Sequence, residues 1–146
     1  MAESPLDTVP GRIVKYTMEL YRKDGVSAEA FDDWFTNTVA PKAVPVYQKH
    51  NVIKFALYRT DHKVSTAFQG MMEQARPGWK VSDCDVVLEH WVHDMHTIMA
   101  HSQDPEWARE VLKDQELWVD LSKSTIHIGY DTTYLENGAI MNLGGR

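Results

Sequence analysis

Polar and apolar residues alternate in four segments of the chain, and such alternation is typical of β-strands with one buried face. In the first segment the apolar side chains are those of Val14, Tyr16, Met18 and Leu20, separated by polar residues. The other three segments read VIKFALYR, DVVLEHWVH and TIHIGYDTTY. The pattern therefore predicts strands over residues 13–22, 52–59, 85–93 and 125–134.

The connections after the first and third of these strands have helical spacing. Ser27 is a typical N-cap residue, and apolar residues follow it at helical intervals. Pro41 and Pro45 interrupt that pattern, so we expect the helix to bend or restart there. Asp94 is placed to cap a second helix, and Asp104-Pro105 to start a further helical piece.

Residues 60–82 have no clean period. They predict a short helix over residues 67–74, ended by Pro77-Gly78. Glycine and methionine in this stretch suit adaptable apolar contacts. We expect this segment to form a long connection, an excursion that runs over the domain and acts as a mobile lid on a pocket.

The order of elements is strand, helix, strand, excursion, strand, helix, strand. Two split β-α-β units of this kind give a ferredoxin-like α+β domain, with a four-stranded antiparallel sheet and helices on one face. We expect one domain over residues 13–136, a disordered tail over 1–12 and a loose C-terminal tail over 137–146. Because no helix remains to cover the second sheet face, we expect a homodimer whose sheets face each other and enclose pockets.

Composition and charge narrow the class of partner. Hydrophobic residues make up 43% and charged residues 25% of 146 residues, as in globular proteins. No apolar run approaches the ~20 residues of a transmembrane helix, and residues 1–12 lack the apolar core of a signal peptide, so we expect no membrane partner. The single cysteine, Cys84, fits a reducing compartment, so we expect a cytoplasmic protein. The 15 Lys and Arg residues are dispersed in a chain of net charge −6, which argues against a nucleic acid partner.

Aromatic and histidine side chains are numerous for a small acidic chain. There are 5 Trp, 6 Tyr, 4 Phe and 7 His residues. Trp and Tyr often line pockets for flat organic ligands, which favours a small-molecule substrate. Ordinary contacts in the core and across a dimer would use the same residues.

Five stretches of the sequence together resemble one known family. They are YRKDGVSAEAFDDWF, ARPGW, SDCDVVLEHWVHD, SQDPEW and GYDTTYLE. Over residues 13–136 their order and spacing resemble the EthD-type branch of the dimeric α+β barrel superfamily, and within it small fungal polyketide-pathway decarboxylases. Such relatives commonly carry a His-x-Pro step near the end of the first helix. Here Val39 stands at the position of that histidine and Pro41 is retained, so a mechanism that uses the histidine does not transfer.

His127 is the first candidate for proton transfer. It interrupts an apolar strand, where we expect burial on both sides, and an imidazole exchanges protons near neutral pH. Glu19 and Glu89 are mid-strand carboxylates, and either would be its partner under a covering subunit. His90 and His93 are further candidates on the third predicted strand. For each of these three histidines and two glutamates, the alternative is a purely structural role.

Candidate pocket walls come from the same strands and from the excursion. They are Tyr16, Tyr21, Tyr58, Trp91, Met71 and Trp79, and plain packing is the alternative for each. His93, Asp94, His96 and His101 look like a metal cluster, but the five-residue step from His96 to His101 does not share a helical face, so we predict no metal site. No glycine-rich phosphate loop opens a helix, and we expect no cofactor.

Several reactions fit these residues. A cofactor-free decarboxylation needs one proton donor for the carbon that loses CO2 and a pocket that disfavours the solvated carboxylate. A histidine with a glutamate partner and aromatic walls suffices, and the resemblance implies decarboxylation of an aromatic or β-keto polyketide acid in secondary-metabolite biosynthesis. The same groups would serve a cyclase, a dehydratase or an isomerase, including a pericyclase. A non-catalytic ligand-binding module is the remaining alternative, and the missing histidine at Val39 favours it slightly.

Overall fold

The computed structural model describes residues 4–144, and its centre is a four-stranded antiparallel sheet. The strands are β1 (Val14–Leu20), β2 (Lys54–Arg59), β3 (Val86–Val92) and β4 (Thr125–Tyr130), in the spatial order β2-β3-β1-β4. The four predicted strands are confirmed, with shorter bounds than the alternation suggested. The predicted ferredoxin-like α+β class is confirmed as well.

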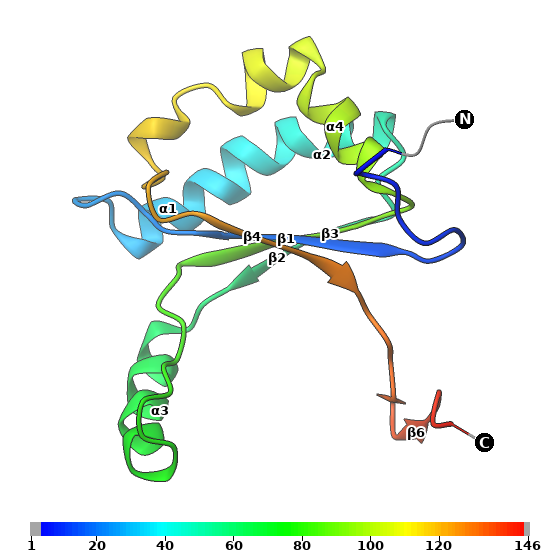
Figure 1. Cartoon of the computed structure of the whole chain (residues 1–146). Helices are drawn as coiled ribbons and strands as arrows, with labels where there is room; N and C mark the ends of the chain where they lie inside the picture. The colour runs from blue at the N-terminus through cyan, green and yellow to red at the C-terminus, as the bar shows by residue number, and fades with distance from the viewer. Residues whose placement is uncertain (1–3, 145–146) are drawn as a thin grey trace.

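Most of the helical segments cover one face of this sheet (Figure 1). They are α1 (Ala28–Trp34), η1 (Phe35–Val39), α2 (Ala40–Lys49), α4 (Met95–Ser102), η2 (Trp107–Val111) and η3 (Gln115–Leu117). The Ser27 side chain accepts a hydrogen bond from the Ala30 amide at 3.1 Å, as its N-cap position predicts. Asp94 caps α4 in the same way, with 2.8 Å to the His96 amide.

The first helical segment does not end at its prolines. Residues 28–49 form one helical run, in which the π-helical turn η1 separates α1 from α2 just before Pro41. Proline has no N–H for the helical ladder, and a wider turn before it is one way to accommodate this. The run carries the side chains of α2 over the sheet.

The excursion between β2 and β3 differs from the expectation. It forms α3 (His62–Ala75), a helix of 14 residues. The N-cap residue is Asp61, whose side chain accepts a hydrogen bond from the Val64 amide at 3.0 Å. No residue of α3 is buried, and the helix projects from the sheet on the face opposite the other helices (Figure 1). It therefore does not lie over the helix-covered side of the domain. The apolar stripe of Val64, Phe68 and Met71 is too narrow to give a clear helical period.

The N-terminal tail packs against the domain from Ser4 onward, whereas residues 1–3 lie outside the described residues. The Val9 amide donates a hydrogen bond to the Tyr130 hydroxyl at 2.9 Å. The carboxylate of Asp7 lies 3.0 Å from His96 Nε2. The part of the tail from residue 4 is therefore tied to β4 and α4.

The chain after β4 forms a short hairpin that reaches into residues 137–146, for which the sequence predicted only a loose tail; residues 145–146 lie outside the described residues. Its strands are β5 (Leu135–Glu136) and β6 (Ala139–Ile140). The turn residues Asn137 and Gly138 both have positive φ, 50° and 80°, as a tight Asn-Gly hairpin turn requires. This segment extends from the sheet on the same side as α3 (Figure 1).

The core lies between the sheet and the helices. Even-numbered residues of β1 and β3 face the helices, and the buried ones include Val14, Leu20, Val86, Leu88 and Val92. Odd-numbered residues point to the other face, which is left open in the single chain. The strand register sets His90 beside Tyr16 on one side and Phe55 on the other.

Candidate functional site

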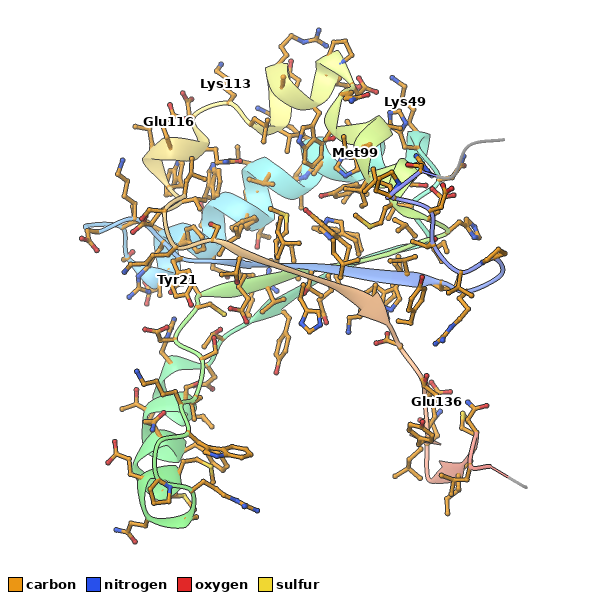
Figure 2. All side chains as sticks on the ribbon, in the orientation of Figure 1. Tyr21, Lys49, Met99, Lys113, Glu116 and Glu136 are labelled. Atoms are coloured by element: carbon orange, nitrogen blue, oxygen red, sulfur yellow. The ribbon has the colours of Figure 1, made fainter. Side chains whose placement is uncertain are left out.

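The sheet and the helices enclose a cavity of about 350 Å³. This volume lies within the usual range of sites for small organic ligands, roughly 300–1,000 Å³. Figure 2 shows side chains of both layers extending into this space, with Met99 labelled on α4. The walls are mainly aromatic and aliphatic, and the aromatic rings are those of Tyr16, Trp34, Phe35, Tyr47, Phe55, His90, His101 and Trp107.

None of the described residues that line this cavity carries a formal charge at neutral pH. Apart from Trp indoles, the polar side chains are two histidines, two tyrosines, two serines and one glutamine, namely His90, His101, Tyr16, Tyr47, Ser102, Ser124 and Gln115. Burial lowers the pKa of His90 and of His101 to about 4 in each case, so both imidazoles are neutral. A ligand inside meets aromatic faces and neutral hydrogen-bonding groups, and no cation to pair with a carboxylate.

His90 is held by hydrogen bonds at both ring nitrogens. Its side chain is 1% exposed, with Nδ1 at 3.1 Å from the Tyr16 carbonyl oxygen and Nε2 at 2.8 Å from the Tyr47 hydroxyl. A carbonyl only accepts, so Nδ1 carries the hydrogen and Nε2 accepts the hydroxyl hydrogen of Tyr47. Burial raises the pKa of Tyr47, which keeps its hydroxyl protonated.

His101 has no such partners. It continues the buried stripe of α4 after Met95 and Ile98, and it is 5% exposed. Neither ring nitrogen has a hydrogen-bond partner among residues 4–144. Its ring packs edge-on against Tyr47 and Trp107, with centroids at 4.9 and 4.6 Å. A buried polar group without a partner costs about 1–3 kcal/mol, and beside a cavity it is a natural contact point for a ligand.

Two of the residues chosen from the sequence, Tyr16 and His90, line this cavity. His127 is exposed on the open face, where Thr17 lies opposite it in the register. The expectation that His127 is buried on both sides is therefore wrong for the single chain. Its apolar neighbours Ile126 and Ile128 point to the other side of the sheet because side chains alternate along a strand. A proton-transfer role for His127 stays a prediction that requires cover from a second copy.

The two glutamates also lie on the open face, and neither is hydrogen-bonded to His127. Glu89 pairs with Lys15 at 2.9 Å. Glu19 accepts a hydrogen bond from the Thr125 hydroxyl at 3.2 Å. Both carboxylates are thus engaged with neighbours in the sheet, and their catalytic roles stay predictions.

The remaining candidates lie away from the cavity. On the open face, the ring of Trp91 lies between the ammonium groups of Lys15 and Lys54, at 4.8 and 4.6 Å from the ring centroid. The others are exposed or half-exposed outside the core: His93 beyond the end of β3, Tyr58 on β2, Met71 and Trp79 on and after α3, and Tyr21 after β1. Figure 2 labels Tyr21 near the end of the sheet at which β1 finishes. Their roles in binding or catalysis stay predictions.

Sequence reasoning missed Tyr47 and considered His101 only as a metal ligand. The signal for both is helical spacing: Ala43 and Tyr47 are four residues apart, and Met95, Ile98 and His101 follow at intervals of three. Such spacing identifies a buried stripe, and a polar residue on it needs an explanation. In residues 4–144, no group of three or more His, Cys, Asp or Glu side chains is arranged to hold a metal ion. Within that range, too, no helix has the length and apolar character to cross a membrane.

Comparison with known sequences places the chain in a family. The sequence profile of the EthD domain matches residues 23–122, more than half of the chain. The chain belongs to the EthD family. This confirms the resemblance seen in the sequence.

Several fungal proteins have sequences similar to this chain. A protein named dehydratase iacD from Pestalotiopsis fici is 59% identical over 132 residues, which cover 90% of this chain and 95% of that protein. A conidial pigment biosynthesis dehydratase, EthD, from Metarhizium robertsii is 26% identical, with 90% and 92% covered. A protein named decarboxylase from Claviceps purpurea is 20% identical, with 81% and 82% covered.

Solved structures agree on the fold. HapK from Hahella chejuensis superposes with a TM-score of 0.53 at 12% identity, covering 84% of this chain and 98% of that one. An EthD family protein from Bacillus halodurans gives a TM-score of 0.50 at 18% identity, covering 82% and 99%. At this level of identity the comparison supports the ferredoxin-like architecture of EthD proteins and nothing finer.

Proposed function

We propose that this EthD-family chain is a cofactor-free dehydratase that removes water from a flat, uncharged polyketide-type substrate in the cavity between sheet and helices. The observation that carries the proposal is the uncharged lining of the cavity, to which His101 contributes a ring whose nitrogens have no hydrogen-bond partner among residues 4–144. The names of two fungal relatives, both called dehydratases, support the same reaction.

The uncharged lining favours dehydration over decarboxylation, the reaction that the sequence resemblance implied. A carboxylate moved from water into a site without a counter-ion costs several kcal/mol. A hydroxy ketone or a phenol has no charge to desolvate. The relatives point the same way, because the protein named dehydratase is 59% identical and the one named decarboxylase is 20% identical.

A single histidine can carry out the elimination. Neutral His101 takes the proton from the carbon beside a carbonyl, and the electrons of that C–H bond form the new double bond. The C–O bond to the leaving hydroxyl breaks, and the imidazolium returns its proton to that oxygen, so that water leaves and His101 is neutral again. The low pKa of the buried imidazole, about 4, makes the imidazolium a strong acid toward the leaving group. Gain of an aromatic ring in the product would drive the reaction.

Product masses test the reaction directly. The purified protein is incubated with a non-aromatic, hydroxylated polyketide-type ketone and with its carboxylated counterpart. We expect loss of one water from the uncharged compound. Loss of CO2 from the acid without loss of water contradicts the proposal, unchanged mass with a new retention time indicates an isomerase or cyclase, and no product at any pH indicates a binding module.

The uncharged cavity also predicts a preference for neutral ligands. At neutral pH we expect 2-naphthol to bind at least roughly 100-fold more tightly than 2-naphthoate, because the carboxylate has no partner there. Leu112 lines the cavity and is partly exposed. Leu112→Arg therefore supplies a cation, and it should reduce the difference between the affinities for 2-naphthol and 2-naphthoate. Calorimetric titration measures both affinities. Equal affinity of the unmodified chain for the two compounds would show that the cavity holds a carboxylate.

We further propose that a second copy covers the open sheet face, with α3 as one of its contacts. A helix of 14 residues with no buried residue is marginally stable in water, and α3 exposes the stripe of Val64, Phe68 and Met71. Light scattering should give twice the chain mass of 16.8 kDa. We expect Phe68→Asp with Met71→Asp to shift the protein toward the monomer, whereas Thr66→Asp, off the stripe, should not. A monomeric unmodified chain at micromolar concentration contradicts this assembly.

A further inference from the structure

We infer that the Tyr47 hydroxyl acts as a hydrogen-bond acceptor that selects ligands with a free hydroxyl group. His90 is the positioning residue: it accepts the hydrogen of the Tyr47 hydroxyl and so leaves Tyr47 only lone pairs to offer a ligand. The inference rests on the proposed site and specifies its substrate class: a phenol or enol in place of its methyl ether. It concerns binding, so it can be tested separately from water loss.

The donor and acceptor roles of His90 and Tyr47 follow from a chain of hydrogen bonds that starts at the backbone. The carbonyl oxygen of Tyr16, 3.1 Å from His90 Nδ1, can only accept, so Nδ1 must carry the hydrogen. A neutral imidazole has one N–H, and Nε2 is left with a lone pair. The Tyr47 hydroxyl, 2.8 Å away, must therefore donate its hydrogen to Nε2. Tyr47 Oη has only lone pairs left to offer.

Among residues 4–144, no other side chain packed against Tyr47 occupies those lone pairs. Its ring contacts Phe55 at 4.8 Å, Trp107 at 5.1 Å and His101 at 4.9 Å between centroids, and within residues 4–144 its hydroxyl is hydrogen-bonded to His90 alone. Tyr47 lines the cavity and is itself buried. A ligand oxygen placed beside it must bring its own hydrogen.

A ligand without that hydrogen leaves a buried acceptor facing an oxygen lone pair. Loss of one buried hydrogen bond typically costs about 1–3 kcal/mol, and sites built around a hydroxyl reject analogues that lack it. We therefore expect a free hydroxyl to be preferred over its methyl ether by roughly 10- to 100-fold in affinity.

Two uncharged probes test the preference on the full chain. We expect 2-naphthol to bind roughly 10- to 100-fold more tightly than 2-methoxynaphthalene in a calorimetric titration. In Tyr47→Phe the two affinities should come within a few-fold of each other. In His90→Phe the Tyr47 hydroxyl is free to donate, so 2-methoxynaphthalene should gain affinity although Tyr47 is intact. Tyr134→Phe, at an exposed tyrosine that does not line the cavity, is the matched control and should keep the preference.

The tautomer of His90 gives a readout that needs no ligand. In a ¹⁵N-labelled chain we expect the neutral Nδ1–H form, assigned by its loss in His90→Phe. An Nε2–H tautomer, or equal affinity of the unmodified chain for both probes, overturns the inference whether or not the variants fold. If the chain binds 2-naphthol selectively but removes no water, the inference about Tyr47 stands and the proposed dehydratase function is contradicted. If the chain removes water but does not discriminate between the two probes, the dehydratase function stands and the inference about Tyr47 is contradicted.

Discussion

His101→Phe is expected to fold, to bind 2-naphthol within a few-fold of the unmodified chain, and to lose at least roughly 100-fold in dehydration turnover. The phenyl ring keeps the edge-on contacts with Tyr47 and Trp107 and removes the proton chemistry. It also removes two buried nitrogens that have no partner among the described residues. We therefore expect the free energy of unfolding to rise by about 1–2 kcal/mol while activity falls, because orphaned buried polar groups destabilise the folded state. Product formation and urea unfolding measure the two effects.

His127→Phe is the comparison that locates the site. The same substitution on the open face leaves the cavity intact, so it should preserve most of the turnover if the cavity is where water is lost. The alternative is a site on the open face under a second copy, with Glu19 or Glu89 as partner. Loss of activity in His127→Phe together with normal activity in His101→Phe would establish that alternative and remove His101 from the mechanism.

The alternation of polar and apolar residues along the strands predicts which side chains lie on the same face of the sheet. It placed Tyr16 and His90 on the apolar face and Glu89 and Trp91 on the polar one, and the register confirms this. It did not reveal which face bounds a cavity. Polar strand residues suggested a site on their own face, whereas the cavity lies behind the apolar face, where the helices do not fill all the space.

The Tyr47–His90 contact could not have been predicted in the same way. The two residues are 43 positions apart, and their approach depends on how α2 crosses β3. That crossing is set by the packing of many side chains and not by a local pattern. The bounds of α3 were missed for a different reason: its apolar stripe is narrow, and its remaining residues are polar or small. The N-cap residues Ser27 and Asp94 were predictable because capping is local chemistry.

Acid should destabilise the chain well above the pH at which carboxylates titrate, because two histidines are buried in the neutral form. The pKa of His90 and of His101 falls from an ordinary 6.5 to about 4 on folding. Below pH 6.5 the unfolded chain binds protons at these positions and the folded chain does not. The free energy of unfolding therefore falls as pH drops from 6.5 to 4, with a slope of up to roughly 1.4 kcal/mol per pH unit for each histidine.

Over that window each histidine would remove about 3 kcal/mol, a large share of the ~5–15 kcal/mol that stabilises a typical domain. Hydrogen bonds from Lys49 and His50 hold the pKa of Asp104 below its ordinary 3.8, so the stability it contributes is lost only at lower pH. Urea unfolding at a series of pH values and fixed protein concentration measures the slope. His101→Phe should reduce it by about half, and His127→Gln, at an exposed position, serves as the control. An unchanged slope in His101→Phe would mean that folding does not lower the pKa of His101, which contradicts the burial of its imidazole in the neutral form.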